Sequence, residues 1–123
     1  MKTLLIVAHG SRRETSNEEV LTLAERLRSL PELDFDRVET GFLELAEPSI
    51  PAAVEECIEQ GASRLAVFPY FLAAGRHVIS DIPAAIEPMR ERYPWVHIEI
   101  LPHLGAAPGL AGLIARAAKE SDT

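Results

Sequence analysis

Three side chains of the kinds that bind divalent metals follow three apolar runs of the sequence. His9 comes directly after the first run, Glu44 lies just past the second, and His77 lies a few residues beyond the third. Two imidazoles and a carboxylate suit a divalent first-row metal ion. The sequence therefore points to metal chemistry, provided that the fold brings the ends of these runs together.

Four such runs, each followed by a segment of helical periodicity, organise the chain. They span residues 3–8, 37–42, 64–70 and 96–101, and their spacing of about 30 residues is typical of strand–helix units. This alternation predicts an α/β fold, with a flavodoxin-like parallel sheet of four strands in the order 2-1-3-4 and helices on both faces. In this order a crevice opens at the carboxyl ends of strands 1 and 3. We therefore expect His9 and His77 to share one crevice, with Glu44 at the same sheet edge.

The helical segments have recognisable ends and one apolar face each. Ser49 can cap the start of the second helix, and Gly61 follows its end. Asp81 precedes the third helix, which Pro88 should kink or shorten because proline lacks a backbone N–H. Pro108 fits the first turn of the fourth. The predicted apolar faces are Val20, Leu23, Ala24, Leu27 and Leu30; Ile50, Ala53, Val54, Cys57 and Ile58; Ile82, Ala85, Ile86 and Met89; and Leu110, Leu113, Ile114 and Ala117.

The other histidines and the arginines near the predicted crevice give weaker signals. His97 alternates with apolar residues inside the last run, so it should face a helix or solvent. His103 lies on the correct sheet edge but farther from the crevice. Arg12, Arg13 and Arg76 flank the two principal histidines and could either pair with an anionic ligand or stay solvated in their loops.

Composition and charge limit the possible partners. The chain has 123 residues, of which 47% are hydrophobic and 25% charged, and this predicts one globular domain over residues 1–123. A net charge of −7 argues against a nucleic-acid partner. No apolar run approaches the roughly 20 residues of a membrane span, and the first is too short for a secretory signal. The single Cys57 is predicted to be a core residue. We expect a cytoplasmic protein without a membrane partner.

Three motifs, in order along the chain, resemble the CbiX/SirB sirohydrochlorin chelatases. They are Ala-His-Gly-Ser-Arg at 8–12, Phe-Leu-Glu-Leu-Ala-Glu-Pro-Ser-Ile at 42–50 and the segment 69–83, which contains Gly-Arg-His. The resemblance runs from the start to about residue 105 and implies a chelatase-like fold. It further implies insertion of Co²⁺, or of Fe²⁺ or Ni²⁺ in sister branches, into sirohydrochlorin during cobalamin or sirohaem synthesis. The metal would then be a substrate, with no permanently bound cofactor.

The resemblance also assigns roles to individual positions. His9 would be a metal ligand and proton acceptor, and His77 the second metal ligand. The substrate would be contacted by Glu44, Leu72, Ala73, Ala74, Gly75 and Arg76. The chain is similar to the short family form with one half, which implies a homodimer with the active-site cavity between subunits. It departs from the family near its end, where Ala107 stands before Pro108 in place of a histidine.

Two other classes of function stay open at this point. A non-catalytic metal or tetrapyrrole binder would keep the same residues without turnover. A phosphocarrier of the mannose-type phosphotransferase class also places a histidine directly after its first strand, although such a domain needs no counterpart of His77. A histidine phosphatase requires an arginine before its histidine, and Ala8 occupies that position.

Overall fold

The first strand is apolar from Leu4 to Ala8, as expected of a strand that is covered on both faces. In the computed structural model, which describes residues 1–120, β1 (Lys2–Ala8) lies between β2 (Arg37–Phe42) and β3 (Arg64–Pro69), and β4 (His97–Ile100) pairs with β3. All pairings are parallel and the order is β2-β1-β3-β4, which confirms the predicted topology. The last three residues of the predicted domain lie outside the described part.

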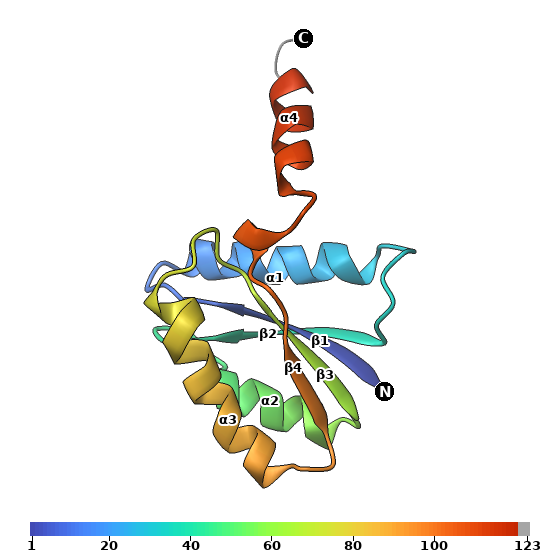
Figure 1. Ribbon diagram of the computed structural model, residues 1–123, viewed down its shortest axis with the longest axis vertical. Coiled ribbons are helices and arrows are strands. Elements are labelled where there is room, and N and C mark those ends of the chain that lie inside the picture. Colours follow the sequence, from blue (N-terminus) through green and yellow to red (C-terminus); the bar gives the residue numbers. More distant parts are fainter. Residues whose placement is uncertain (121–123) are drawn as a thin grey trace.

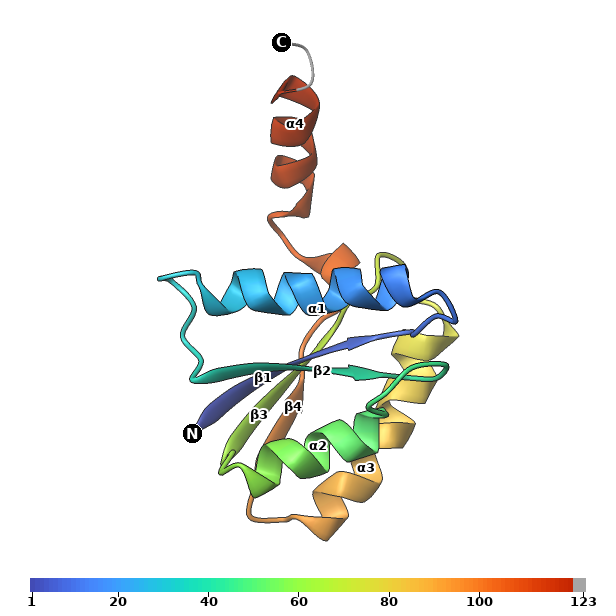
Figure 2. The ribbon, with the colours of Figure 1, turned by 180° about the vertical axis from the view of Figure 1, so that it is seen from behind.

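Alternate residues of β1 enter two separate cores. Leu5 and Val7 pack beneath α2 (Ile50–Glu59) and α3 (Ile82–Arg92), whereas Leu4 and Ile6 pack beneath α1 (Glu14–Arg28). Figures 1 and 2 show α1 along one face of the sheet and α2 with α3 along the other. The prediction of helices on both faces is therefore confirmed, and the carboxyl ends of β1, β2 and β3 share one edge of the sheet.

The first two helices largely follow their predicted faces. Val20 and Ala24 of α1 are buried, but Leu30, predicted on the same face, lies beyond the helix end and is 44% exposed. This part of the prediction is wrong because α1 stops at Arg28, before the next turn could bring Leu30 back to the sheet. In α2 the Ser49 hydroxyl accepts a hydrogen bond from the Ala52 amide at 3.3 Å, as expected of a capping residue.

The third helix continues through its proline. A single π-helical turn (His77–Asp81) leads into α3, which runs past Pro88 to Arg92. The prediction that Pro88 shortens the helix is wrong. Ile86 and Met89, on either side of Pro88, are buried in the core, and their packing holds the helix together although proline removes one of its hydrogen bonds.

The fourth helix does not pack on the sheet. A 3-10 turn, η2 (Leu104–Ala106), leads to α4 (Leu110–Glu120), which projects away from the body of the molecule (Figures 1 and 2). Its predicted apolar face is open: Leu113 is 54% exposed and Ile114 60%. Pro108 lies ahead of the helix rather than in its first turn. Among residues 1–120 there is no helix with the length and apolar character needed to cross a membrane.

Each outer strand of the sheet receives an arginine from the adjacent helix. Arg28, at the end of α1, donates from Nε and Nη2 to the carbonyl of Val38 in β2, with the Nε bond at 3.0 Å. Arg90 of α3 donates from the same two nitrogens to the carbonyl of Ile98 in β4, at 3.1 and 3.0 Å. At each edge of the sheet, an arginine side chain thus donates to a strand carbonyl.

Candidate active site

The two principal histidines lie against each other at the carboxyl edge of the sheet. His9 follows β1 directly, and the loop after β3 returns His77 to the same place as the first residue of the π turn. Their ring centroids are 4.6 Å apart with the rings inclined at 63°. The neighbouring positions of β1 and β3 thus bring together two residues that are far apart in sequence. Both remain accessible, with 37% and 42% of their side chains exposed.

Both ring nitrogens of His9 have oxygen neighbours. Nδ1 lies 2.9 Å from the carbonyl oxygen of Gly10, and because a carbonyl only accepts, Nδ1 must carry a proton and donate it. Nε2 lies 2.8 Å from Oε1 of Glu44. This is a hydrogen-bond distance, and one of the two atoms must supply the proton for such a bond. The structure therefore places an imidazole nitrogen and a carboxylate oxygen where they could exchange a proton or bind one cation together.

The backbone sets the position of Glu44 relative to His9. The amide of Leu43 donates to the carbonyl of Ala8 at 2.9 Å, and that of Glu44 donates to His9 at 3.0 Å, so the chains leaving β1 and β2 stay in register beyond the sheet. Gly10 has a φ of +95°, and a Cβ built there would lie 1.8 Å from the carbonyl oxygen of Glu44. Only glycine fits this approach. From the sequence alone Gly10 is a weak signal, because glycine after a strand is common.

His77 is held by a residue that we considered only as the start of a helix. Its Nδ1 lies 2.8 Å from Oδ2 of Asp81, four positions later. Asp81 is the last residue of the π turn and has helical backbone angles, and its carboxylate makes no capping bond. The Phe71 ring stacks on the His77 ring, with centroids 6.3 Å apart. The His-x-x-x-Asp spacing could have indicated this pair, since residues four apart meet on a helix.

The segment expected to contact a substrate forms an exposed rim beside His77. Leu72 is 70% exposed, and residues 73–76, including Arg76, are exposed as well. Gly105 of η2 packs against this rim: its amide donates to Phe71 at 3.0 Å, and a Cβ there would lie 1.7 Å from the carbonyl oxygen of Leu72. The rim is therefore fixed to the turn that leads into α4.

The remaining candidates lie outside this cluster. His97 begins β4, at the amino edge of the sheet opposite His9, and is exposed, in agreement with the prediction. His103 is half-buried directly before η2. Arg12 and Arg13 are exposed in the loop after His9, which is compatible with either of the roles considered for them.

His9, Glu44 and His77 do not make a complete metal site by themselves. Among residues 1–120, no three or more His, Cys, Asp or Glu side chains are grouped so that they could hold a metal ion by themselves. His9, Glu44 and His77 nevertheless offer two imidazoles and a carboxylate from adjoining strand ends. A metal bound by these side chains would still have open coordination positions.

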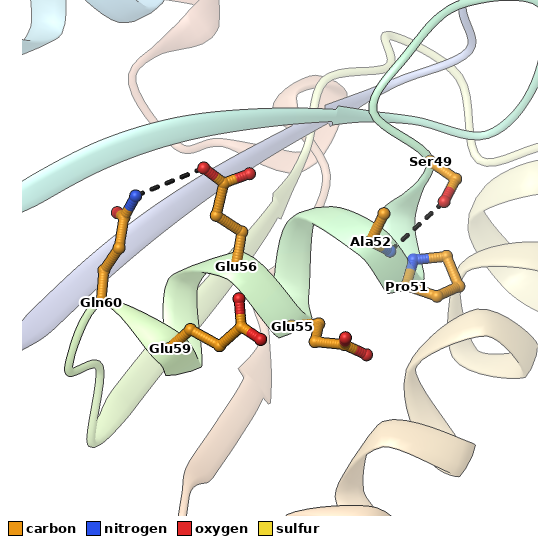
Figure 3. Close-up of a pocket in the computed structure, with 7 residues that line it drawn as sticks. All are labelled: Ser49, Pro51, Ala52, Glu55, Glu56, Glu59 and Gln60. Carbon is orange, nitrogen blue, oxygen red and sulfur yellow. Dashed lines mark hydrogen bonds between the residues drawn. The ribbon is translucent and has the colours of Figure 1, made fainter.

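A hollow along α2 provides a useful contrast (Figure 3). Three glutamates dominate its lining, which consists of Ser49, Pro51, Ala52, Glu55, Glu56, Glu59 and Gln60. It contains no imidazole, thiol or arginine, and Glu56 already accepts a hydrogen bond from Gln60 at 3.3 Å. We therefore do not consider it a catalytic site.

The CbiX family model matches residues 3–121. This chain belongs to the CbiX family. Among curated proteins, this CbiX chain is 41% identical over 98 residues to the sirohydrochlorin ferrochelatase of Priestia megaterium, covering 80% of this chain and 36% of that protein. It is 48% identical over 85 residues to the sirohydrochlorin cobaltochelatase of Methanocaldococcus jannaschii, covering 68% and 57% respectively. The chain thus spans between about a third and three-fifths of the length of these relatives.

Solved structures show the same fold. A putative cobalamin biosynthesis CbiX protein from Marinobacter aquaeolei has a TM-score of 0.81 to this CbiX chain at 32% identity, with 98% of this chain and 97% of that one covered. SirB from Bacillus subtilis with Fe³⁺ has a TM-score of 0.84 at 30% identity, but this chain covers only 48% of it while 99% of this chain is covered. The sheet and its helices therefore correspond to about half of SirB.

Proposed function

We propose that this protein is a sirohydrochlorin chelatase, which inserts a divalent metal into the tetrapyrrole, with Co²⁺ the favoured metal and Fe²⁺ and Ni²⁺ as alternatives. The observation that carries the proposal is the cluster of His9, His77 and Glu44, with the rings 4.6 Å apart and the carboxylate on His9. The names of the relatives, ferrochelatase and cobaltochelatase, support it. We place the reaction in the cytoplasm, where the single buried Cys57 stays reduced.

The chemistry of metal insertion fits these side chains. Two pyrrole N–H protons must leave as one dication enters, so the reaction needs ligands that deliver the metal and groups that accept protons. His9 and His77 provide the imidazole ligands. Glu44, 2.8 Å from Nε2 of His9, can take over a proton from that ring. The open coordination positions would be filled by the ring nitrogens of the substrate as the metal transfers.

The exposed rim beside His77 provides a surface for the macrocycle. Leu72, Ala73, Ala74 and Gly75 offer small or apolar contacts to a flat ring, and Arg76 offers a counter-charge to an anionic substrate. No permanently bound cofactor is required in this scheme, since the metal is consumed with each turnover.

The decisive test is anaerobic metal insertion into sirohydrochlorin, followed by its absorbance with Co²⁺, Fe²⁺ and Ni²⁺. We expect acceleration over the uncatalysed rate, and a loss of about 10²-fold or more in His9→Ala and in His77→Ala. His97→Ala is the matched control, because that histidine lies at the opposite edge of the sheet, and it should retain full activity. Absence of acceleration with all three metals would contradict the proposal and favour a non-catalytic binder.

The phosphocarrier alternative is disfavoured by Glu44. A phosphoryl group on Nε2 of His9 would have to displace a carboxylate that lies 2.8 Å away, and two anionic groups at this distance repel each other. The purified protein can be incubated with a phosphocarrier protein that is phosphorylated on histidine, and then examined by mass spectrometry. An added phosphoryl group on His9 would revive this alternative.

We further propose a homodimer in which α4 of each protomer packs on the other. Residues 111–120 are all exposed, although Leu110, Leu113, Ile114 and Ala117 share one side of the helix. An apolar stripe of this kind normally covers a core. SirB, which is about twice as long as its matched part, has a second half in the same chain, and a second copy would take its place here. Because η2 is fixed to the rim beside His77, a partner bound to α4 would lie close to the active site.

A further inference from the structure

We propose that Asp81 is a positioning residue for His77, whose ring it holds so that Nε2 presents its lone pair to the incoming metal. The inference rests on the proposed role of His77 as a metal ligand. It adds a residue that neither the motif resemblance nor the comparisons assign.

The hydrogen bond between the two side chains determines which nitrogen of His77 is available. Nδ1 lies 2.8 Å from Oδ2 of Asp81. A carboxylate has lone pairs and no proton to give, so Nδ1 must be the donor. In the neutral ring, Nε2 is then the unprotonated nitrogen. The geometry thus selects one tautomer and leaves the other nitrogen for a metal, in the manner of carboxylate–histidine–metal arrangements.

The local backbone is built around this contact. His77 and Asp81 are the first and last residues of the π turn, in which the amide of Ile82 donates to the carbonyl of His77 five residues earlier. Such single π turns occur frequently at functional sites. The turn brings both side chains to the same side of the chain directly ahead of α3, whose buried Ile82 fixes it to the core.

Asp81 does not cap a helix, although an aspartate before a helical segment suggests that role. Its backbone angles are helical (φ −72°, ψ −39°), because the π turn runs directly into α3. An N-cap residue has non-helical angles and faces free amides of a first turn. The Asp81 carboxylate therefore has no cap to make at this position, and it bonds His77 instead.

The second histidine is oriented in a corresponding way by a different group. His9 donates from Nδ1 to the carbonyl of Gly10 at 2.9 Å, so both rings are held through Nδ1, while Nε2 of His9 lies 2.8 Å from Oε1 of Glu44. The partner of His77 is charged, and a charge-assisted bond is the stronger of the two. Asp81 should therefore make His77 the more firmly oriented of the two rings.

The test uses Co²⁺ alone and measures binding and tautomer together. Asp81→Asn keeps the size of the side chain but removes its charge, and Asp81→Ala removes the bond. We expect Co²⁺ affinity, measured by calorimetry, to fall about tenfold to a hundredfold in Asp81→Ala, with a smaller loss in Asp81→Asn. Long-range ¹H–¹⁵N spectra at pH 8 should show His77 as the Nδ1–H tautomer in the unmodified protein and a mixture of tautomers in Asp81→Ala.

Two controls separate positioning from other roles. Glu91→Gln removes one carboxylate from α3 and should leave affinity and tautomer unchanged. Asp81→Glu, which can still reach Nδ1, should restore part of both. An unchanged tautomer of His77 in Asp81→Ala would overturn the inference, whether Co²⁺ binding is retained or lost. A loss of Co²⁺ binding without a change of tautomer would make Asp81 a direct metal ligand. If the protein binds Co²⁺ with these effects but never metallates sirohydrochlorin, the proposed function fails and the role of Asp81 stands.

Discussion

His9 and Glu44 can meet only because Gly10, in the loop between β1 and α1, has no side chain. We therefore predict that Gly10→Ala lowers the free energy of unfolding by about 1–3 kcal/mol and weakens metal binding. The new Cβ must push the carbonyl of Glu44 aside, and the alanine must adopt a φ of +95°. Urea unfolding and Co²⁺ calorimetry measure the two effects. Gly109→Ala is the control, because nothing lies within 4 Å of a Cβ at that position. Equal stability of the two variants would be evidence against this account.

Cys57 gives the molecule a pH dependence that can be isolated. Burial, with smaller contributions from Glu39 and Glu56, raises the pKa of its thiol from 9.0 to about 12. Above pH 9 the unfolded chain loses this proton and the folded chain does not, so the free energy of unfolding must fall as pH rises toward 12. Below pH 9 the contribution is constant.

The difference in free energy of unfolding between the unmodified protein and Cys57→Ala measures this effect. We expect it to be about 1.4 kcal/mol smaller at pH 10 than at pH 8, because groups other than Cys57 titrate equally in both proteins. A difference that stays constant over this range would show that the thiol titrates normally in the folded state.

At the scale of elements, Pro88 removes a backbone hydrogen bond from α3, and its side chain is not buried in the core. Its side chain is exposed, while Ile86 and Met89 beside it are buried. Pro88→Ala should therefore restore the missing donor and raise the free energy of unfolding by about 1–3 kcal/mol, as expected for a proline removed from a helix interior. Urea unfolding measures the change. Ala84→Pro, at another exposed position of α3, should lower stability, and an unchanged or lower stability of Pro88→Ala would refute the argument.

The elements that could be predicted from the sequence are those whose pattern reflects burial. β1 is covered on both faces, and β2 begins and ends at the predicted residues. A run of apolar residues indicates a buried strand, and the polar residues beside it indicate the strand ends. The apolar stripe of α4 was recognised equally well, but a stripe does not reveal which surface covers it. Asp81 was missed because a helix start and a histidine partner require the same residue type, and only the geometry of the π turn distinguishes them.

At the scale of the whole molecule, α4 provides a direct test of assembly. Leu113→Glu combined with Ile114→Glu places charges on the open apolar stripe and should convert a dimer into a monomer, as measured by sedimentation velocity. Lys119→Glu, on the opposite side of the helix, is the matched control and should leave the dimer intact. A protein that sediments as a monomer before any substitution would refute the proposed exchange of α4.

Assembly through α4 would leave the borders of the sheet uninvolved. A parallel sheet of four strands ends in β2 and β4, whose outward carbonyls could accept strands from other molecules and start aggregation. The guanidinium groups of Arg28 and Arg90 occupy one such carbonyl on each border. A strand approaching either edge of the sheet would have to displace a guanidinium group before it could pair. The same two contacts that attach helices to strands therefore also keep neighbouring molecules from joining their sheets in a crowded solution.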